Sequence, residues 1–299
     1  MEPFQRTYEF FGLTCASEID LPGCRAGAGT PDVIIRHGSV PAHLEQPTLV
    51  GGAFEAAPSH YLLRIHGVAA FWVRDGREII VDRVNGADDA AVSLFLLGSA
   101  LTALMHQRDV LALHASAVVG DHGAIAIAGA PGRGKSTLTA ALAARGYRVL
   151  CDDLTVITLD HAGRPLAHPG VPQLKLWPDA LQRLGHDPER LATVRRGVEK
   201  RRFEITDAIT TPVPLARIVV LASESSDSVV VEAIEHARKF EMLRLQTKLP
   251  RAFASLANPA VHFRIAAAVA AQVPMVTVTR PRRGDTVAEV VDHIVGARS

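Results

Sequence analysis

A glycine-rich octapeptide, Gly129-Ala-Pro-Gly-Arg-Gly-Lys-Ser136, contains the residue types that bind phosphate groups. Its spacing fits the pattern G-x-x-x-x-G-K-[ST] at every required position. The glycines at 129, 132 and 134 allow positive φ angles, which turn successive backbone N–H groups inward around phosphate oxygens. Lys135 is expected on the β- and γ-phosphates and the Ser136 hydroxyl on Mg²⁺. The octapeptide therefore predicts a site for a nucleoside triphosphate and Mg²⁺. The expected nucleotide-binding residues are Gly129, Ala130, Pro131, Gly132, Arg133, Gly134, Lys135, Ser136 and Thr137.

The segments on either side of this octapeptide have the patterns that such a site needs. Residues 124–128 are apolar and predict a buried strand, and residues 136–145 predict a helix that Gly146 ends. The positive N-terminus of that helix would face the phosphates. A glycine-rich turn with a coincidental lysine is the alternative, and the strand–loop–helix context favours the phosphate site.

Two adjacent carboxylates, Asp152 and Asp153, follow a predicted strand over residues 148–151. A carboxylate at a strand end beside a phosphate-binding loop commonly holds Mg²⁺, which is the role expected for Asp152. A second carboxylate can act as a general base toward an attacking hydroxyl. Consecutive strand residues point to opposite faces, so a bulge or a strand end must bring both carboxylates to one site. Alternatively, one of the two only caps a turn.

His114 and a run of basic residues are further candidates. His114 lies in an apolar, strand-like run over residues 110–119, where an interior histidine without catalytic role is the alternative. The basic run comprises Arg195, Arg196, Lys200, Arg201 and Arg202. It predicts either a solvated face or a mobile loop that closes over the γ-phosphate. In the second case the guanidinium fork favours Arg201 or Arg202 over Lys200. A second basic cluster, residues 280–283, predicts a solvated turn, with nucleoside contacts as the alternative.

The elements that position these residues predict an α/β protein in two parts. Residues 1–87 contain short β-branched and aromatic segments between turn signals, including Arg74-Asp-Gly-Arg77, and predict a small β-rich domain. Residues 88–108 follow a helical period and predict a linking helix. Strands alternate with helices over residues 109–299, which predicts a sheet flanked by helices.

Composition limits the functions that are compatible with this organisation. The 299 residues are 48% hydrophobic and 21% charged, with a net charge of +1. This balance predicts a globular protein and gives no general attraction to nucleic acid or to a membrane surface. The uncharged run between Asp89 and Arg108 is short and mixed for a membrane span and predicts a buried helix. Three cysteines without paired spacing and no visible signal segment favour the cytoplasm.

Three segments together resemble the catalytic domain of bacterial HPr kinase/phosphorylase. They are Leu113-His-Ala-Ser-Ala-Val-Val119, the glycine-rich octapeptide, and Arg145-Gly-Tyr-Arg-Val-Leu-Cys-Asp-Asp153. The resemblance implies that Asp153 is the general base, that Asp152 lies on the Mg²⁺ side and that His114 supports the base. It also implies a P-loop fold related to phosphoenolpyruvate carboxykinase, here preceded by the β-rich domain.

The chain departs from that family after residue 157. The family has a second signature, L-E-I-R-G-L-G, whose Glu binds Mg²⁺ and belongs to the part linked with dephosphorylation. The comparable segment here is Gln173-Leu-Lys-Leu-Trp-Pro178, which places Lys175 where the Glu would fall. A later catalytic arginine of the family has no counterpart. Residues 169–177 and 200–202 look more like shorter HPr-kinase-like proteins, among them kinases that phosphorylate a C-terminal serine of lasso peptide precursors.

The sequence thus predicts an ATP- and Mg²⁺-dependent kinase that acts on a hydroxyl, in the first place a serine of a peptide or protein. The expected catalytic residues are Asp153, His114, Lys135, Arg201 and Arg202, and the expected metal ligands are Ser136 and Asp152. A kinase of a small hydroxylated metabolite and a nucleotide-dependent switch are the rivals, and a switch needs only one of the two carboxylates. The sequence leaves the acceptor and the oligomeric state, homo-oligomers included, open.

Overall fold

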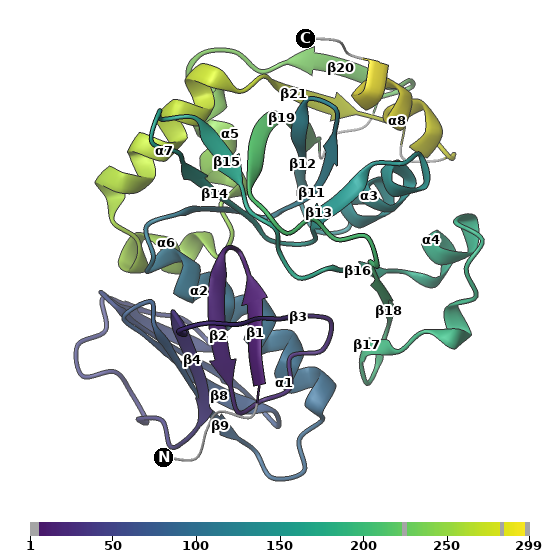
Figure 1. The fold of residues 1–299 in the computed structure, drawn as a ribbon. Helices are drawn as coiled ribbons and strands as arrows, with labels where there is room; N and C mark the ends of the chain where they lie inside the picture. Colours follow the sequence, from purple (N-terminus) through teal and green to yellow (C-terminus); the bar gives the residue numbers. More distant parts are fainter. Residues whose placement is uncertain (1–5, 223–225, 282–283, 297–299) are drawn as a thin grey trace.

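The computed structural model describes residues 6–222, 226–281 and 284–296. These residues form a mixed α/β structure with three β-sheets (Figure 1). The N-terminal sheet lies at the bottom of that view and the sheet that carries β12 lies at the top. Arg282 and Arg283 of the second basic cluster lie outside the described residues.

The N-terminal sheet contains the first nine strands, in the order β3-β1-β2-β4-β9-β8-β7-β6-β5. Its strands are β1 (Arg6–Phe10), β2 (Leu13–Ser17), β3 (Arg25–Ala26), β4 (Val33–His37), β5 (Leu49–Val50), β6 (Phe54–Ala57), β7 (His60–Ile65), β8 (Ala69–Arg74) and β9 (Glu78–Arg83). The predicted hairpin turn joins β8 to β9, with positive φ at Asp75 and Gly76. Positive φ at both central residues matches the right-handed twist of the two strands.

A continuous helix follows this sheet in three segments: α1 (Asp89–Phe95), a π-helical turn η1 (Leu96–Ala100) and α2 (Leu101–His106). The Asp88 side chain accepts a hydrogen bond from Ala90 N and caps the helix. Within the described residues this is the one helix that is long and apolar enough to cross a membrane. Because 61% of it is buried inside the protein, it has the burial of a core helix.

The second sheet has the order β10-β14-β15-β19-β12-β11-β13, with β21 beside β19 and β20 beside β21. Its strands are β10 (Leu111–Leu113), β11 (Ala115–Gly120), β12 (Gly123–Gly129), β13 (Arg148–Cys151), β14 (Thr155–Leu159), β15 (Pro165–Ala167), β19 (Val213–Leu221), β20 (Val230–Ala233) and β21 (Met275–Thr279). Strands β12, β19 and β21 are parallel neighbours. The expected continuous strand over residues 110–119 is interrupted at His114, whose flanking strands pair with different partners.

Helices cover both faces of this sheet. They are α3 (Lys135–Ala144), α5 (Ala237–Gln246), α6 (Pro250–Leu256), α7 (Pro259–Gln272) and α8 (Val287–Gly296). Helices α3 and α8 pack on one face through Leu138, Leu142 and Val290. Helix α7 packs on the opposite face, and α6 packs against α2 and against β6 of the N-terminal sheet. One apolar core runs through both sheets, so the domain boundaries at residues 87 and 108 stay a prediction.

The third sheet is small and projects beside α3, at the right of Figure 1. It consists of β16 (Gln173–Leu176), β17 (Thr193–Arg195) and β18 (Val198–Glu204), and it carries α4 (Pro178–Arg183) and the 3-10 turn η2 (Pro188–Arg190). Residues 195–202, for which a solvated face and a mobile loop were the alternatives, lie in the β17–β18 hairpin, so the mobile-loop alternative is wrong. Regular pairing of β18 with β16 fixes the direction of its basic side chains.

Candidate functional site

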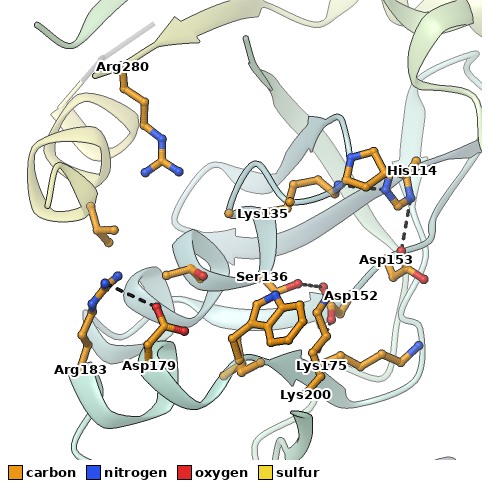
Figure 2. A pocket seen from close by; sticks show the side chains of 17 residues that line it. His114, Lys135, Ser136, Asp152, Asp153, Lys175, Asp179, Arg183, Lys200 and Arg280 are labelled. Carbon is orange, nitrogen blue, oxygen red and sulfur yellow. Dashed lines mark hydrogen bonds and ion pairs between the residues drawn. The ribbon is translucent and has the colours of Figure 1, made fainter. Parts of the chain in front are cut away.

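A cavity of about 350 Å³ lies between the Gly129–Ser136 loop and the third sheet. Figure 2 shows that the labelled side chains converge on it from separate parts of the chain. The loop and α3 contribute one wall, and the segment after β13 contributes the two adjacent carboxylates. Strands β16 and β18 contribute Lys175 and Lys200, and Arg280 reaches in from the end of β21.

The loop has the backbone that the sequence predicted. Gly129, Gly132 and Gly134 all have positive φ, at 145°, 80° and 85°. A Cβ at Gly129 would lie 2.9 Å from the carbonyl oxygen of Leu221, so the close passage of the loop past β19 requires a glycine there. Gly134 is the residue before α3, and the first helical N–H groups therefore face the cavity side of the loop.

Lys135 begins α3 and is buried under the loop. Its ammonium donates to the carbonyl oxygens of Gly129 and Ala130, at 2.8 and 3.3 Å, and to Nε2 of His114 at 2.9 Å. Burial lowers the pKa of Lys135, and the nearby carboxylates of Asp153 and Asp152 oppose that shift. The charge of Lys135 is thus held in place by acceptors that surround the loop.

Asp152 accepts hydrogen bonds from three directions. Its Oδ1 accepts from the Ser136 hydroxyl at 2.9 Å and from the Ser116 hydroxyl at 2.6 Å. Its Oδ2 accepts from the backbone N–H of Lys175 at 3.0 Å. These contacts fix the carboxylate beside Ser136, which is the pair of residues that the sequence predicted as metal ligands.

Asp153 lies in a tight turn directly after β13. Leu154 N donates to the carbonyl oxygen of Asp152 at 2.9 Å, and Asp153 between them has a φ of 69°. A left-handed backbone at a residue other than glycine costs on the order of 1–3 kcal/mol and is concentrated at functional sites. The strand end therefore brings both carboxylates toward the cavity, as the sequence argument required.

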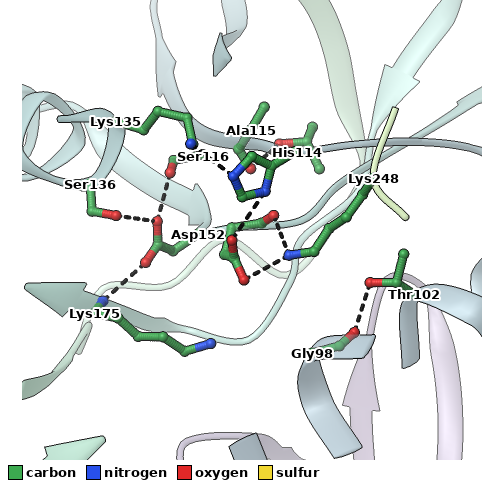
Figure 3. Close-up of polar contacts among 12 residues, drawn as sticks. Gly98, Thr102, His114, Ala115, Ser116, Lys135, Ser136, Asp152, Lys175 and Lys248 are labelled. Carbon is green, nitrogen blue, oxygen red and sulfur yellow. Dashed lines mark hydrogen bonds and ion pairs between the residues drawn. The ribbon is translucent and has the colours of Figure 1, made fainter. Parts of the chain in front are cut away.

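His114 joins Lys135 to Asp153 (Figure 2). Figure 3 shows the contact between His114 and Lys135 beside the contacts of Asp152. The Lys135 ammonium can only donate, so His114 Nε2 accepts and carries no proton. The proton of the neutral ring must then be on Nδ1, which lies 3.2 Å from Oδ1 of Asp153 and donates to it. His114 is placed by the gap between β10 and β11, where its own N–H donates to the Gln246 carbonyl oxygen at 2.7 Å.

Lys248 is a site residue that sequence analysis did not find. Its ammonium lies 2.6 Å from Oδ2 of Asp153 and donates to the Asp153 carbonyl oxygen at 2.7 Å. Only 13% of the Lys248 side chain is exposed. Burial works against ionisation of Asp153, yet the charge of Lys248 and the hydrogen bond from His114 hold the pKa of this carboxyl well below its usual range. Asp153 is therefore ionised at neutral pH.

The structure places the basic residues differently from the order of preference in the sequence analysis. Arg201 pairs with Glu189 at 3.0 Å, and Arg202 donates to the carbonyl oxygens of Ala90 and Val194. Neither lines the cavity, whereas Lys200 does, at 5.4 Å from the ring of the half-exposed Trp177. Strand alternation in β18 turns Arg201 to the face opposite Lys200. Arg202 shares the face of Lys200, but its guanidinium is held by the carbonyl oxygens of Ala90 and Val194 instead.

Arg280 likewise differs from the solvated turn that was expected. Its guanidinium donates to the Arg133 carbonyl oxygen at 3.0 Å and lines the cavity across from Lys200. Burial lowers the pKa of Arg280. Arg183 also lines the cavity and pairs with Asp179 at 3.4 Å. The cavity is consequently bordered by five cationic side chains, which come from α3, β16, α4, β18 and the residue after β21.

Comparison with known proteins adds a structural neighbour. No protein-family profile matches the chain, and no curated protein sequence matches it. Among solved structures, the chain is similar to the HPr(Ser) kinase/phosphatase from Coxiella burnetii, with a TM-score of 0.35 and 13% sequence identity. That similarity covers 62% of this chain and 94% of the other. A likeness this distant says nothing of the reaction, which rests on the side chains described above.

Proposed function

We propose that this protein is an ATP- and Mg²⁺-dependent kinase that transfers the γ-phosphoryl group to a serine hydroxyl of a peptide or protein. One observation carries the proposal. Lys135, His114 and Asp153 form a hydrogen-bonded series, and the Ser136–Asp152 pair lies beside it in the same cavity. A phosphate-binding lysine, a metal-binding pair and an ionised carboxylate are the parts that phosphoryl transfer to a hydroxyl needs.

The Ser136–Asp152 pair fits Mg²⁺ bound together with phosphates. Adjacent ligands of an octahedral Mg²⁺ lie about 3 Å apart, and the two side-chain oxygens are 2.9 Å apart. Within the described ranges no group of three or more His, Cys, Asp or Glu could hold a metal ion. This agrees with Mg²⁺ sites that use one or two protein ligands, water and substrate phosphates. Bound there, Mg²⁺ would neutralise charge on the β- and γ-phosphate oxygens.

Asp153 receives the acceptor hydroxyl. Its ionised carboxylate accepts the hydroxyl hydrogen bond and so aims the oxygen at the γ-phosphorus. The new O–P bond forms, the bond from phosphorus to the bridging oxygen of ADP breaks, and the hydroxyl proton passes to Asp153. Because its low pKa makes Asp153 a weak base, its main effect is to orient the hydroxyl, with proton transfer late in the reaction.

Lys135 and Lys200 supply positive charge for the phosphoryl group. Lys135 would exchange its contacts with the loop carbonyls for phosphate oxygens. Lys200, with Trp177 beside it, faces the same cavity from β18 and takes the place that was expected for Arg201 or Arg202. The acceptor class, a peptide such as a lasso peptide precursor, is supported by the resemblance of residues 169–177 and 200–202 and stays part of this proposal.

The test is transfer of label from [γ-³²P]ATP and Mg²⁺ to serine peptides, with matched alanine and threonine peptides as controls. Label in the serine peptide supports the kinase. Label in a small hydroxylated metabolite instead would move the assignment to that class of acceptor. Nucleotide-dependent partner binding with phosphate released only to water would indicate a switch.

Reversal of the reaction provides a second test. Lys175 occupies the cavity wall, and a protonated lysine cannot ligate Mg²⁺. We therefore predict a kinase that works in one direction. The purified phosphopeptide should not lose phosphate when incubated with enzyme, Mg²⁺ and millimolar inorganic phosphate. Release of pyrophosphate in that mixture would show that the metal geometry for the reverse reaction is supplied by other residues.

A further inference from the structure

The segment that carries Lys248 is held beside the site by backbone pairing. Gln246 accepts from the His114 N–H at 2.7 Å, and the Lys248 N–H donates to the Ala112 carbonyl oxygen at 2.9 Å. Leu113 and Thr247 form an isolated antiparallel bridge between these two contacts. The two groups that flank the Asp153 carboxylate, His114 and Lys248, therefore lie on paired backbone segments.

His106, the last residue of α2, contacts the backbone of this segment at Lys248. Its side chain is fully buried, and its Nε2 lies 2.6 Å from the carbonyl oxygen of Lys248. A carbonyl oxygen only accepts, so Nε2 carries the proton and donates. Burial lowers the pKa of His106 to about 4, which keeps the ring neutral at physiological pH. Its Nδ1 has no hydrogen-bond partner within the described residues, so the bond to Lys248 is the polar contact that orients the ring.

The same end of α2 is attached to the N-terminal sheet. Gln107 Oε1 accepts from the N–H of Gly76 at 2.8 Å, and Arg108 donates to the Gly76 carbonyl oxygen at 2.8 Å. Gly76 lies in the β8–β9 turn. Hydrogen bonds from the consecutive residues 106–108 therefore connect the N-terminal sheet to the backbone of Lys248, whose side chain pairs with Asp153.

We propose that His106 is a positioning residue for phosphoryl transfer. By fixing the Lys248 carbonyl it fixes the ammonium that holds Asp153, and it makes the N-terminal sheet part of the support of the catalytic carboxylate. This inference rests on the proposed kinase function. A displacement of about 1 Å at a reacting group can cost on the order of a hundredfold in rate, so loss of this bond should be visible in kcat.

Variants of His106 separate positioning from packing. His106→Gln keeps an N–H donor at the reach of Nε2, whereas His106→Leu keeps volume and removes the donor. His106→Asn keeps polarity but is too short to reach the carbonyl. His262→Leu is the matched control, because the His262 ring packs at a tilt against the same Phe253 ring that His106 contacts edge to face, at 4.2 Å against 5.1 Å between ring centroids, without a bond to Lys248.

The measurement is kcat and KM for MgATP in phosphoryl transfer to a serine peptide, with the full chain. His106→Leu and His106→Asn should lower kcat about tenfold to a hundredfold with KM within twofold. His106→Gln should stay within threefold of the parent, and His262→Leu within twofold. In an Asp153→Asn background, His106→Leu should lower kcat by less than a further twofold, because it acts through Asp153.

Two results would overturn the inference. One is a His106→Leu protein that is as active as His262→Leu. The other is a double variant whose fold-loss in kcat equals the product of the losses in His106→Leu and Asp153→Asn. If His106→Leu does not fold, the comparison of His106→Gln with His106→Asn decides in its place. Full activity of Asp153→Asn alone would instead overturn the proposed function and this inference with it.

Discussion

The N-terminal sheet and the region around Asp153 differ in the sign of the charge that they bury. In the N-terminal sheet, ion pairs such as Arg6–Asp20 and Arg83–Asp89 are exposed, and where a pair is partly covered the buried partner is a carboxylate, Glu55 or Glu78. Around Asp153, the Lys248 partner is only 13% exposed, and Lys135 is buried as well. Exposed ion pairs contribute roughly 0–1 kcal/mol, whereas a buried charge is costly unless it is paired.

The backbone conformations of the two regions also differ in what they serve. In the β8–β9 turn, the positive φ of Asp75 and Gly76 serves the hairpin itself. At Asp153, which follows the end of β13, a positive φ turns a carboxylate toward a cavity. His114 lies between the end of β10 and the start of β11. Departures from regular structure that serve no local purpose tend to mark functional sites. The backbone at Asp153 therefore supports the proposed site, although residues outside the cavity, such as Phe11, His236 and Leu249, also have positive φ.

The largest expected loss of activity is that of a Lys135 variant. Lys135→Ala should weaken MgATP binding and reduce phosphoryl transfer by about a thousandfold or more, because a charge aimed at the phosphates is lost. The control, Arg83→Ala, removes an exposed ion pair and should leave turnover within about twofold and stability within about 1 kcal/mol. Both are measured by transfer kinetics and thermal unfolding. Unchanged turnover of Lys135→Ala would remove the basis for a phosphate site in this loop.

The next largest effects should distinguish the roles of the two adjacent carboxylates. Asp153→Asn should lower kcat by roughly a hundredfold or more with MgATP affinity nearly intact, since a neutral amide orients the hydroxyl less strongly than the carboxylate and cannot take its proton. Asp152→Asn should instead raise the Mg²⁺ concentration needed for half-maximal rate, because it removes a ligand beside Ser136. A Mg²⁺ titration of both variants checks this. Interchangeable behaviour of the two variants would mean that their roles are not separate.

The pH dependence of the free energy of unfolding tests the burial of His106. His106 has a pKa of about 4 in the folded protein against an ordinary value of 6.5. Between these values the unfolded chain binds a proton that the folded chain does not, so the free energy of unfolding falls as pH falls from about 6.5 to about 4. The loss is up to about 3 kcal/mol. Urea unfolding over this pH range should show that slope, and His106→Gln should lack this part of it.

The smallest expected effect distinguishes the two faces of β18. Lys200→Met should lower transfer about tenfold, because its ammonium faces the cavity. Arg201→Met should change it less than about twofold, because its partner Glu189 is exposed and lies outside the cavity. Transfer rates at saturating MgATP measure both. A loss confined to Arg201→Met would return the role on the γ-phosphate to the arginine that the sequence favoured.

Local sequence patterns predicted much of the fold around the loop. The apolar run before Gly129, the alanine- and leucine-rich segment after Ser136 and the β-branched run before Asp152 appear as β12, α3 and β13. These signals are local, since they depend on residues within a few positions of each other. They were enough to place the loop and both carboxylates in one region.

The remainder depended on contacts that no local pattern contains. Lys248 reaches Asp153 through the bridge between Leu113 and Thr247, which are far apart in the sequence. Strand β18 has five basic or acidic residues in succession or near succession, which hides its alternation and resembles a loop. The π-helical turn η1 leaves the helical period of residues 88–108 almost unchanged, so the sequence does not reveal it.

The position of α6 has a consequence for synthesis of the chain on the ribosome. Strand β6 ends at Ala57, and α6, which packs against it, begins at Pro250, 193 residues later. At about 5–20 residues per second, that interval corresponds to roughly 10–40 s of translation. During this time the N-terminal sheet emerges with part of its apolar surface uncovered. We expect the nascent chain to depend on ribosome-associated chaperones until α6 has been made.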